Sequence, residues 1–314
     1  QNELSLVNCV LQCKGILKND GTVNGMVDVC GGKRDYENAY YTVGSQLMGG
    51  TGTYTDLYFT STAGYAIHKV DMKTKEHTII FHEEGIRPAA VKIHKDGRLF
   101  ACCLMNETIG GILAMDPDGS NQEWIVKGYS VDDLAFDQDG GIYFTDFRGD
   151  FKNPIGGVYY ITPDFKHIEP FCQNMCQPNG IAFSTDYSVL WVTEFQAQRL
   201  HRFDLTTNRA GIPFYFTGML GPDSCCVDAD DNVYVAMPGQ GRILIFNYFG
   251  SPIGQVVVPG REEGHNLHTT HPMVRPDHNE LYIVAQDKAE PTQGSWVFKG
   301  PSYAVGNKNM FQFL

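Results

Sequence analysis

A repeated short aromatic strand constrains the fold of this 314-residue chain more than any other feature of its sequence. Six segments share one pattern: a turn, a short apolar strand with an aromatic residue, a loop, and a second strand that ends near a polar residue. The aliphatic anchors of the six first strands lie 42 to 48 residues apart and are Leu57, Leu99, Ile142, Leu190, Val233 and Leu281. Self-similarity at this period predicts an array of equivalent small sheets.

Repeats of this length, built from four short strands each, are typical of propeller blades. No long window shows helical periodicity. We therefore predict an all-β, six-bladed β-propeller that forms a single domain over residues 1–314. Residues 1–45 and the tail 310–314 are expected to supply the strands that close the ring, because an open propeller would leave bare sheet edges.

The charge balance narrows the possible partners. The chain carries 24 Lys and Arg against 36 Asp and Glu, which gives a formal net charge of −12. Nucleic acids and anionic membrane surfaces both require a basic face, so we expect neither as a partner. No apolar run approaches the roughly 18 residues of a membrane span, so no transmembrane segment is expected. A small molecule is the expected ligand, and the sequence leaves the oligomeric state open.

The chain begins at Gln1 rather than Met, as a trimmed chain would, and two features favour a signal peptidase as the cause. Asn106-Glu107-Thr108 is a sequon that could carry an N-glycan at Asn106, and three cysteines, Cys9, Cys13 and Cys30, lie close together near the N-terminus. We therefore predict a secretory-pathway glycoprotein.

The nine cysteines do not form a zinc-binding pattern. The adjacent pairs at 102–103 and 225–226 lie in apolar strands and are expected to be small buried hydrophobic residues. A disulfide within the group Cys9, Cys13 and Cys30, or between Cys172 and Cys176, stays open at this point.

Polar residues recur where the repeat places the start of each innermost strand. Counting back nine to eleven positions from each anchor gives a ring around one mouth of the central channel, made of Met48, Ala89, Asp132, Asn179, Asp223 and His271. The loops after the second strands return to the same rim and add Asp146, Glu194 and Met237. Arg87 is a further rim candidate that could orient an anionic or carbonyl oxygen.

Four ring residues have metal-binding or acid–base capacity and are the candidate catalytic residues: Asp132, Asn179, Asp223 and His271. Carboxylate and amide oxygens are the ligands that a hard cation such as Ca²⁺ prefers. Convergence of such residues from separate repeats on one axis predicts a site, whereas a single one could simply cap a turn.

Several segments resemble one known family in their order along the chain. They include KIHKDGRLF at 92–100, FTDFRG at 144–149, NGIAF at 179–183, LWVTE at 190–194 and GPDSCC at 221–226. Together they are similar to the senescence marker protein/gluconolactonase family from about residue 57 to the C-terminus. The resemblance implies a six-bladed propeller with an axial divalent cation that activates a lactone carbonyl and a water.

The resemblance assigns roles position by position. Asn179 and Asp223 match the family's amide and carboxylate metal ligands, Ser224 follows Asp223 as in a family member, and Asp132 falls where an acidic residue lies near the metal. The first family ligand is a Glu in a Glu-Gly pair, and Met48-Gly49 stands there in this chain. A thioether is a poor Ca²⁺ ligand, so the resemblance also implies a weakened cation site.

Three functions follow, in order of preference. The first is an enzyme that requires no cofactor, similar in character to the fungal hetero-Diels–Alderases of tropolonic sesquiterpenoid biosynthesis. Such an enzyme would hold a quinone methide and a terpene alkene in reactive geometry. The second is a Ca²⁺-dependent lactonase. The third is a secreted propeller that binds a ligand without catalysis. The pocket is expected to be half apolar, with Met48 and Ala89 beside the polar ring residues.

Overall fold

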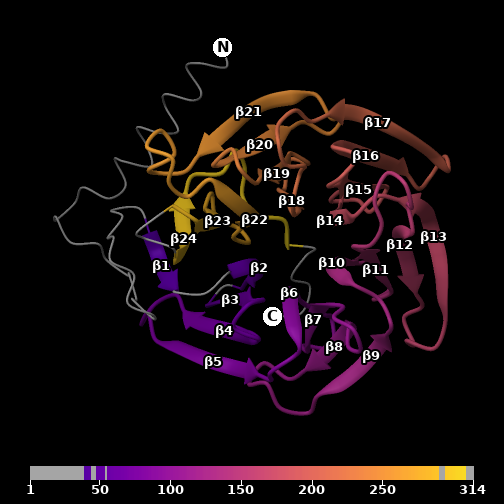
Figure 1. Cartoon of the computed structure of the whole chain (residues 1–314), viewed down its shortest axis with the longest axis horizontal. Coiled ribbons are helices and arrows are strands. Elements are labelled where there is room, and N and C mark those ends of the chain that lie inside the picture. Colours follow the sequence, from indigo (N-terminus) through magenta and orange to yellow (C-terminus); the bar gives the residue numbers. More distant parts are fainter. Residues whose placement is uncertain (1–38, 44–46, 54, 290–293, 309–314) are drawn as a thin grey trace.

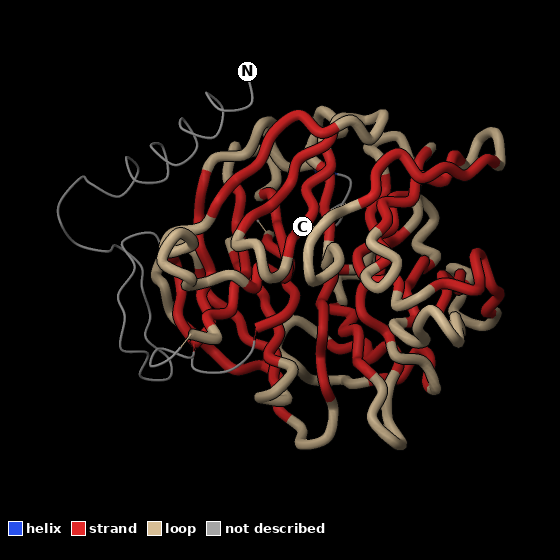
Figure 2. Tube along the Cα trace, turned by 45° about the horizontal axis from the view of Figure 1, so that its top comes forward, coloured by secondary structure: helices blue, strands red, loops and turns tan. Residues whose placement is uncertain are grey.

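The chain folds into a ring of six four-stranded antiparallel sheets (Figure 1). This computed structural model describes residues 39–43, 47–53, 55–289 and 294–308. Within these ranges there is no α-helix, and Figure 2 shows strands and connecting loops throughout. The prediction of an all-β, six-bladed propeller is confirmed.

Each blade is a meander in which consecutive strands pair. Blades 1 to 3 are β2 (Leu47–Gly52), β3 (Asp56–Ser61), β4 (Ala66–Asp71), β5 (His77–His82); β6 (Arg87–Ile93), β7 (Leu99–Leu104), β8 (Gly111–Met115), β9 (Glu123–Lys127); and β10 (Val131–Phe136), β11 (Ile142–Asp146), β12 (Gly156–Ile161), β13 (Ile168–Met175). Blades 4 and 5 are β14 (Pro178–Phe183), β15 (Val189–Glu194), β16 (Arg199–Asp204), β17 (Arg209–Tyr215); and β18 (Cys225–Val227), β19 (Val233–Met237), β20 (Arg242–Phe246), β21 (Pro252–Val257). Blade 6 contains β22 (His268–Val274), β23 (Leu281–Asp287), β24 (Gly294–Gly300) and β1 (Ala39–Val43).

The sixth blade joins the two ends of the described chain. Strand β1 pairs antiparallel with β24, with Val43 opposite Ser295, and so forms the outer edge of a sheet whose other strands come from the C-terminal region. In Figure 1 this places β1 beside β24 at the periphery of the ring. The tail 310–314, which was also expected to help close the ring, lies outside the described residues.

The core lies between neighbouring blades rather than at the centre of the ring. One cluster packs Phe100 and Cys102 of blade 2 against Leu134 and Phe144 of blade 3, all fully buried. Equivalent clusters fill the other interfaces. The aromatic strand positions of the repeat are therefore explained by blade-to-blade packing, which leaves the first strands of the blades to line the channel.

The cysteines of the described region are all free thiols. Cys102, Cys103, Cys225 and Cys226 are buried, as expected of small hydrophobic residues, and burial raises the pKa of each thiol. Cys172 and Cys176 are not joined to each other. The three N-terminal cysteines lie outside the described residues.

The sequon sits in a loop after β7. Asn106 Nδ2 donates a hydrogen bond to Gly85 O at 2.7 Å, and Asn106 Oδ1 accepts from the backbone N–H groups of Thr108 and Ile109. The side chain thus organises its own loop. Glycosylation and secretion stay predictions.

Candidate active site

The polar ring lies where the innermost strands depart from regular pairing. Ring positions coincide with shifts in the pairing register of five innermost strands. The shifts lie between Leu47 and Gly50 in β2, Pro88 and Ala90 in β6, Val131 and Leu134 in β10, Pro178 and Ile181 in β14, and Thr269 and His271 in β22. A β-bulge re-aims the side chains it carries and frees backbone groups from the ladder. Five of the six blades therefore carry an irregularity at the same mouth of the channel, whereas β18 of blade 5 pairs regularly with β19.

Asp132, Asn179 and Asp223 come together at this mouth from blades 3, 4 and 5. They are 3%, 2% and 6% exposed, respectively. The Asn179 amide donates a hydrogen bond to the Asp223 carboxylate, and Asp223 Oδ1 also accepts from Ser224 N at 3.0 Å. The close approach of blades 4 and 5 depends on Gly180, because a Cβ there would lie 2.4 Å from Cys225 N.

The two carboxylates lie close enough to perturb each other. Burial, and then the charges of Asp223 and Asp133, hold the pKa of Asp132 well above its usual range. Burial raises the pKa of Asp223 to about 7, although hydrogen bonds from Ser224 and Asn179 oppose the shift. A cation between them would remove this cost, since it favours the charged form of both groups.

The donor set fits a hard cation. Asn179 Oδ1 is buried without a hydrogen-bond partner. In the described part of the chain no group of three or more His, Cys, Asp or Glu side chains is placed to hold a metal, so a cation at this mouth would have to use a ligand of another kind as well. Here the donors are two carboxylates and one amide oxygen, which is a set suited to Ca²⁺.

His271 belongs to a buried network deeper in the channel. Its Nε2 lies 3.4 Å from Lys92 Nζ, and Lys92 forms an ion pair with Asp133 at 3.2 Å. Asp133 also accepts a hydrogen bond from Leu134 N. This network links blades 2, 3 and 6 across the channel axis. Lys92 and Asp133 were not predicted as site residues from the sequence, although Asp133 adjoins Asp132 in an otherwise apolar strand.

The carboxylates at two second-strand exits hold loops in place. Asp146 accepts from Ser130 N at 2.9 Å and is paired with Arg148. Glu194 accepts from Cys176 N and from His201 Nε2, both at 2.7 Å. Burial would raise the pKa of Glu194, but these hydrogen bonds lower it below its usual range. Both carboxylates are therefore engaged by neighbouring protein groups.

The other candidates have varied surroundings. Met237 is fully buried in the cluster between blades 4 and 5. Ala89 and Ser224 are buried at the ring, whereas Arg87 is exposed at the start of β6. The backbone of Met48 lies in β2, and its side chain is outside the described residues.

A histidine–aspartate pair on the same side of the ring also went unrecognised. His265 Nδ1 lies 2.7 Å from Asp287 Oδ2, and the side chain of Asp287 is 1% exposed. His265 precedes β22 and Asp287 ends β23, so antiparallel pairing brings both to the mouth where the ring lies. Their 22-residue separation along the chain gave no local motif.

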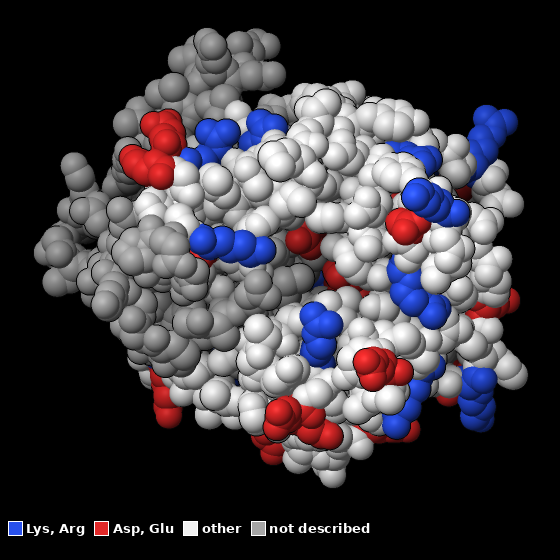
Figure 3. All heavy atoms as spheres, viewed as in Figure 1, with Lys and Arg blue, Asp and Glu red and all other residues white. Residues whose placement is uncertain are grey.

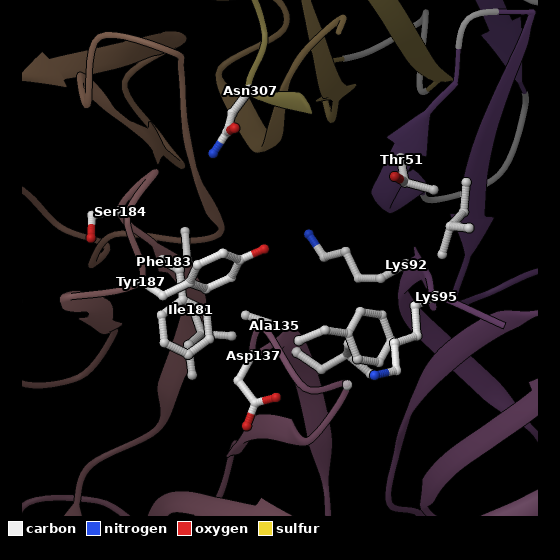
Figure 4. A pocket seen from close by; sticks show the side chains of 15 residues that line it. Thr51, Lys92, Lys95, Ala135, Asp137, Ile181, Phe183, Ser184, Tyr187 and Asn307 are labelled. Atoms are coloured by element: carbon white, nitrogen blue, oxygen red, sulfur yellow. The ribbon is translucent and has the colours of Figure 1, made fainter. Parts of the chain in front are cut away.

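A separate cavity opens at the opposite mouth. It has about 680 Å³ of empty space, including its open end, and it is lined by the far ends of β6, β10 and β14. Figure 4 shows Lys92, Tyr187 and Asn307 extending polar groups around it, with apolar walls that include Phe183. The ring residues start these strands and the cavity residues end them, so the cavity is distinct from the carboxylate site.

Comparison with known proteins identifies the family. Residues 50–286 match the family model described as the SMP-30/Gluconolactonase/LRE-like region. The chain belongs to this family. Lactonase drp35 of Staphylococcus saprophyticus is 50% identical over 262 residues, or 80% of each chain. Lactonase drp35 of Staphylococcus aureus is 51% identical over 259 residues, or 79% of each chain. The resemblance to this family, and the assignment of a lactonase-type propeller enzyme, are confirmed.

Solved structures agree on the architecture. Regucalcin from Agrobacterium tumefaciens aligns with a TM-score of 0.66 at 16% identity, covering 90% of this chain and 98% of its own. A luciferin-regenerating enzyme aligns with a TM-score of 0.67 at 19% identity, covering 86% and 96%. A gluconolactonase from Xanthomonas campestris aligns with a TM-score of 0.62 at 18% identity, covering 82% and 88%. At these identities the likeness concerns the fold alone.

On the face drawn in Figure 3, basic and acidic side chains are interspersed around the ring and form no continuous basic patch. No helix among the described residues is long and apolar enough to cross a bilayer. The expected absence of nucleic-acid and membrane partners stays a prediction.

Proposed function

We propose that this chain hydrolyses lactones with the help of a divalent cation, with Ca²⁺ as the first candidate, at the mouth formed by Asp132, Asn179 and Asp223. The observation that carries the proposal is their convergence from three blades, with Asn179 Oδ1 unpartnered and the pKa values of both buried carboxyls raised. Two buried carboxyls whose charged forms are disfavoured would destabilise the fold if they had only a structural role, whereas a bound cation would stabilise their charged forms.

The three residues have separable tasks. Asp132 and Asp223 would supply the negative charge that offsets the cation, and Asn179 would add a neutral oxygen while its amide hydrogens orient Asp223. A bound cation supplies Lewis acidity, which polarises the lactone carbonyl and lowers the pKa of a water. Without it, Asp223, with a pKa of about 7, can hold a proton near neutral pH.

The comparisons support the choice of reaction. The relatives at 50% and 51% identity bear the name lactonase. Regucalcin, which shares the fold, carries the description of a calcium-binding protein. The departure at Met48, where the family resemblance implies a Glu, predicts that this chain binds its cation more weakly than a relative that keeps the carboxylate.

The cycloaddition that the sequence analysis placed first has no support from these relatives. Lactone hydrolysis, its alternative, therefore takes its place as our proposal. Non-catalytic binding is likewise less favoured, because the named relatives over four-fifths of the chain are enzymes.

The test is a lactone-opening assay on protein whose metal content has been measured. Gluconolactone and δ-valerolactone are offered in turn, and acid release is followed before chelation, after chelation and after Ca²⁺ is restored. We expect hydrolysis to fall to background with chelator and to recover with Ca²⁺. Hydrolysis that persists unchanged in chelator would overturn the role of the cation, and no hydrolysis of any lactone would overturn the reaction.

A further inference from the structure

Three second strands carry a buried threonine at the same position of the repeat. Thr60 in β3, Thr145 in β11 and Thr193 in β15 each lie three residues after the aliphatic anchor, and each is fully buried. The equivalent positions of the other blades are Cys102, Ala236 and Val284. A polar side chain kept in three of six otherwise apolar positions requires hydrogen-bond partners.

Each threonine hydroxyl reaches the ring residue of the next blade. Thr145 Oγ1 donates to Asn179 O at 2.5 Å, and Thr193 Oγ1 donates to Asp223 O at 2.7 Å. Thr60 Oγ1 makes the same bond to Ala89 O at 2.7 Å. The two residues proposed as ligands in blades 4 and 5 are thus both held through their backbone by a hydroxyl from the preceding blade.

The same hydroxyls complete the bulges of their own blades. Thr145 Oγ1 accepts from Asp133 N at 3.1 Å, and Thr193 Oγ1 accepts from Gly180 N at 2.8 Å. Both N–H groups lie where the register shift removes them from the ladder. A hydroxyl can donate one bond and accept another, so each threonine ties its own bulge to the next ring residue.

These bonds form a chain that runs through the site. Thr145 connects the Asp132–Asp133 bulge to Asn179, and Thr193 connects the neighbouring Gly180 to Asp223. The backbone position of one ligand is therefore coupled to that of the next. Groups that fix ligand orientation in this way commonly control metal affinity without touching the metal.

We propose that Thr145 and Thr193 are positioning residues that set the backbones of Asn179 and Asp223 for cation binding. Thr60 makes the same type of bond to Ala89, which has no ligand side chain, and so provides a comparison outside the proposed ligands. This proposal rests on the proposed function, because it assigns the two threonines to that same cation site.

The chain supplies its own matched control. Thr145→Val and Thr193→Val each replace the hydroxyl by a methyl of similar size. Each substitution removes two hydrogen bonds at the ring, one to a backbone N–H and one to a backbone carbonyl. Thr60→Val removes the same type of interblade bond away from the ligands. Calorimetric titration of Ca²⁺ into chelator-treated, dialysed protein gives the Kd, and urea unfolding without cation gives the stability of each variant.

We expect Thr145→Val and Thr193→Val each to raise the Kd for Ca²⁺ by about 10- to 100-fold. Thr60→Val should leave the Kd within about twofold of wild type, although it loses a comparable buried hydrogen bond. Thr145→Ser and Thr193→Ser keep the hydroxyl and should restore most of the affinity. The serine variants also provide a folded comparison if a valine variant does not fold.

Two results would overturn the proposal alone. One is wild-type Ca²⁺ affinity in Thr145→Val and Thr193→Val. The other is an equal loss of affinity in Thr60→Val, which would indicate general loosening of the propeller. Wild-type protein that binds no Ca²⁺ would instead overturn the cation of the proposed function, and this proposal with it.

Discussion

Replacing Asp223 with Asn should stabilise the cation-free protein while it removes cation binding. The ordinary pKa of this carboxyl is 3.8, and burial raises it to about 7 in the folded chain. The folded state therefore holds a proton that the unfolded state has already released. Stability consequently falls as pH rises from about 4 to 7, and the loss is complete above the folded pKa.

The size of the effect follows from that shift. One pKa unit corresponds to 1.36 kcal/mol, so ionised Asp223 destabilises the cation-free fold by about 4 kcal/mol above pH 7. The pKa of about 7 already includes the hydrogen bonds from Ser224 and Asn179, so the neutral amide of the Asp223→Asn variant escapes this whole cost. Asp223→Asn should therefore be about 4 kcal/mol more stable than wild type at pH 8 in chelator, and less so at pH 5.

Thermal unfolding followed by circular dichroism checks this difference. A gain of about 4 kcal/mol corresponds to about 8 °C in Tm for a chain of this size. With Ca²⁺ at about 10,000 times its Kd, wild type should gain about 5.5 kcal/mol and the variant nothing, which reverses their order. Asp139→Asn, at an exposed position, controls for net charge.

A variant that is less stable than wild type in chelator at pH 8 would refute the reasoning. So would a difference in Tm that is the same at pH 5 and pH 8, because the destabilisation would then not come from ionisation of Asp223.

Three further changes probe other parts of the structure. Met48→Glu should lower the Kd for Ca²⁺, measured by calorimetry, by at least tenfold because it restores a carboxylate, whereas Met48→Leu should leave the Kd unchanged. An unchanged Kd in Met48→Glu would show that residue 48 does not face the cation. Gly180→Ala should abolish cation binding and lower the Tm, since its Cβ would lie 2.4 Å from Cys225 N; wild-type values for both would exclude that close approach. Burial and then His77 lower the pKa of His68 to about 4, so the free energy of unfolding should fall by up to about 3 kcal/mol as pH drops from 6.5 to 4. In urea unfolding, His68→Phe should show a smaller fall, whereas His82→Asn, at an exposed position, should show the wild-type fall. An equal fall in all three proteins would exclude His68 as the cause.

The propeller could be predicted because its strongest signal is periodic. The anchor spacing counts the blades, and the aromatic positions between anchors pack one blade against the next, as Phe100 and Phe144 do. The same count placed Asp132, Asn179 and Asp223 on one mouth, since an offset from an anchor is preserved when the sheets are equivalent.

The parts that could not be predicted depend on exceptions to the repeat. Bulges are tolerated at the ring because side chains such as Thr193 form hydrogen bonds with the backbone groups that have no partner in the neighbouring strand. The pattern of apolar residues does not reveal that a side chain replaces the backbone partner in this way. Asp146 and Glu194 had the right offset for the rim, but Arg148 and His201 engage their carboxylates. The buried pair of Lys92 and Asp133 joins two blades through residues 41 positions apart and leaves no local motif.

The most direct test follows Ca²⁺ binding and lactone hydrolysis in one titration of chelator-treated protein, with Asn179→Ala alongside. We predict that acid release from gluconolactone rises from background in proportion to Ca²⁺ bound, with one cation required per chain, and that Asn179→Ala shows neither at the same concentrations. Full hydrolysis before any Ca²⁺ is added, or wild-type binding and hydrolysis in Asn179→Ala, would contradict a cation-dependent lactonase at this mouth of the propeller.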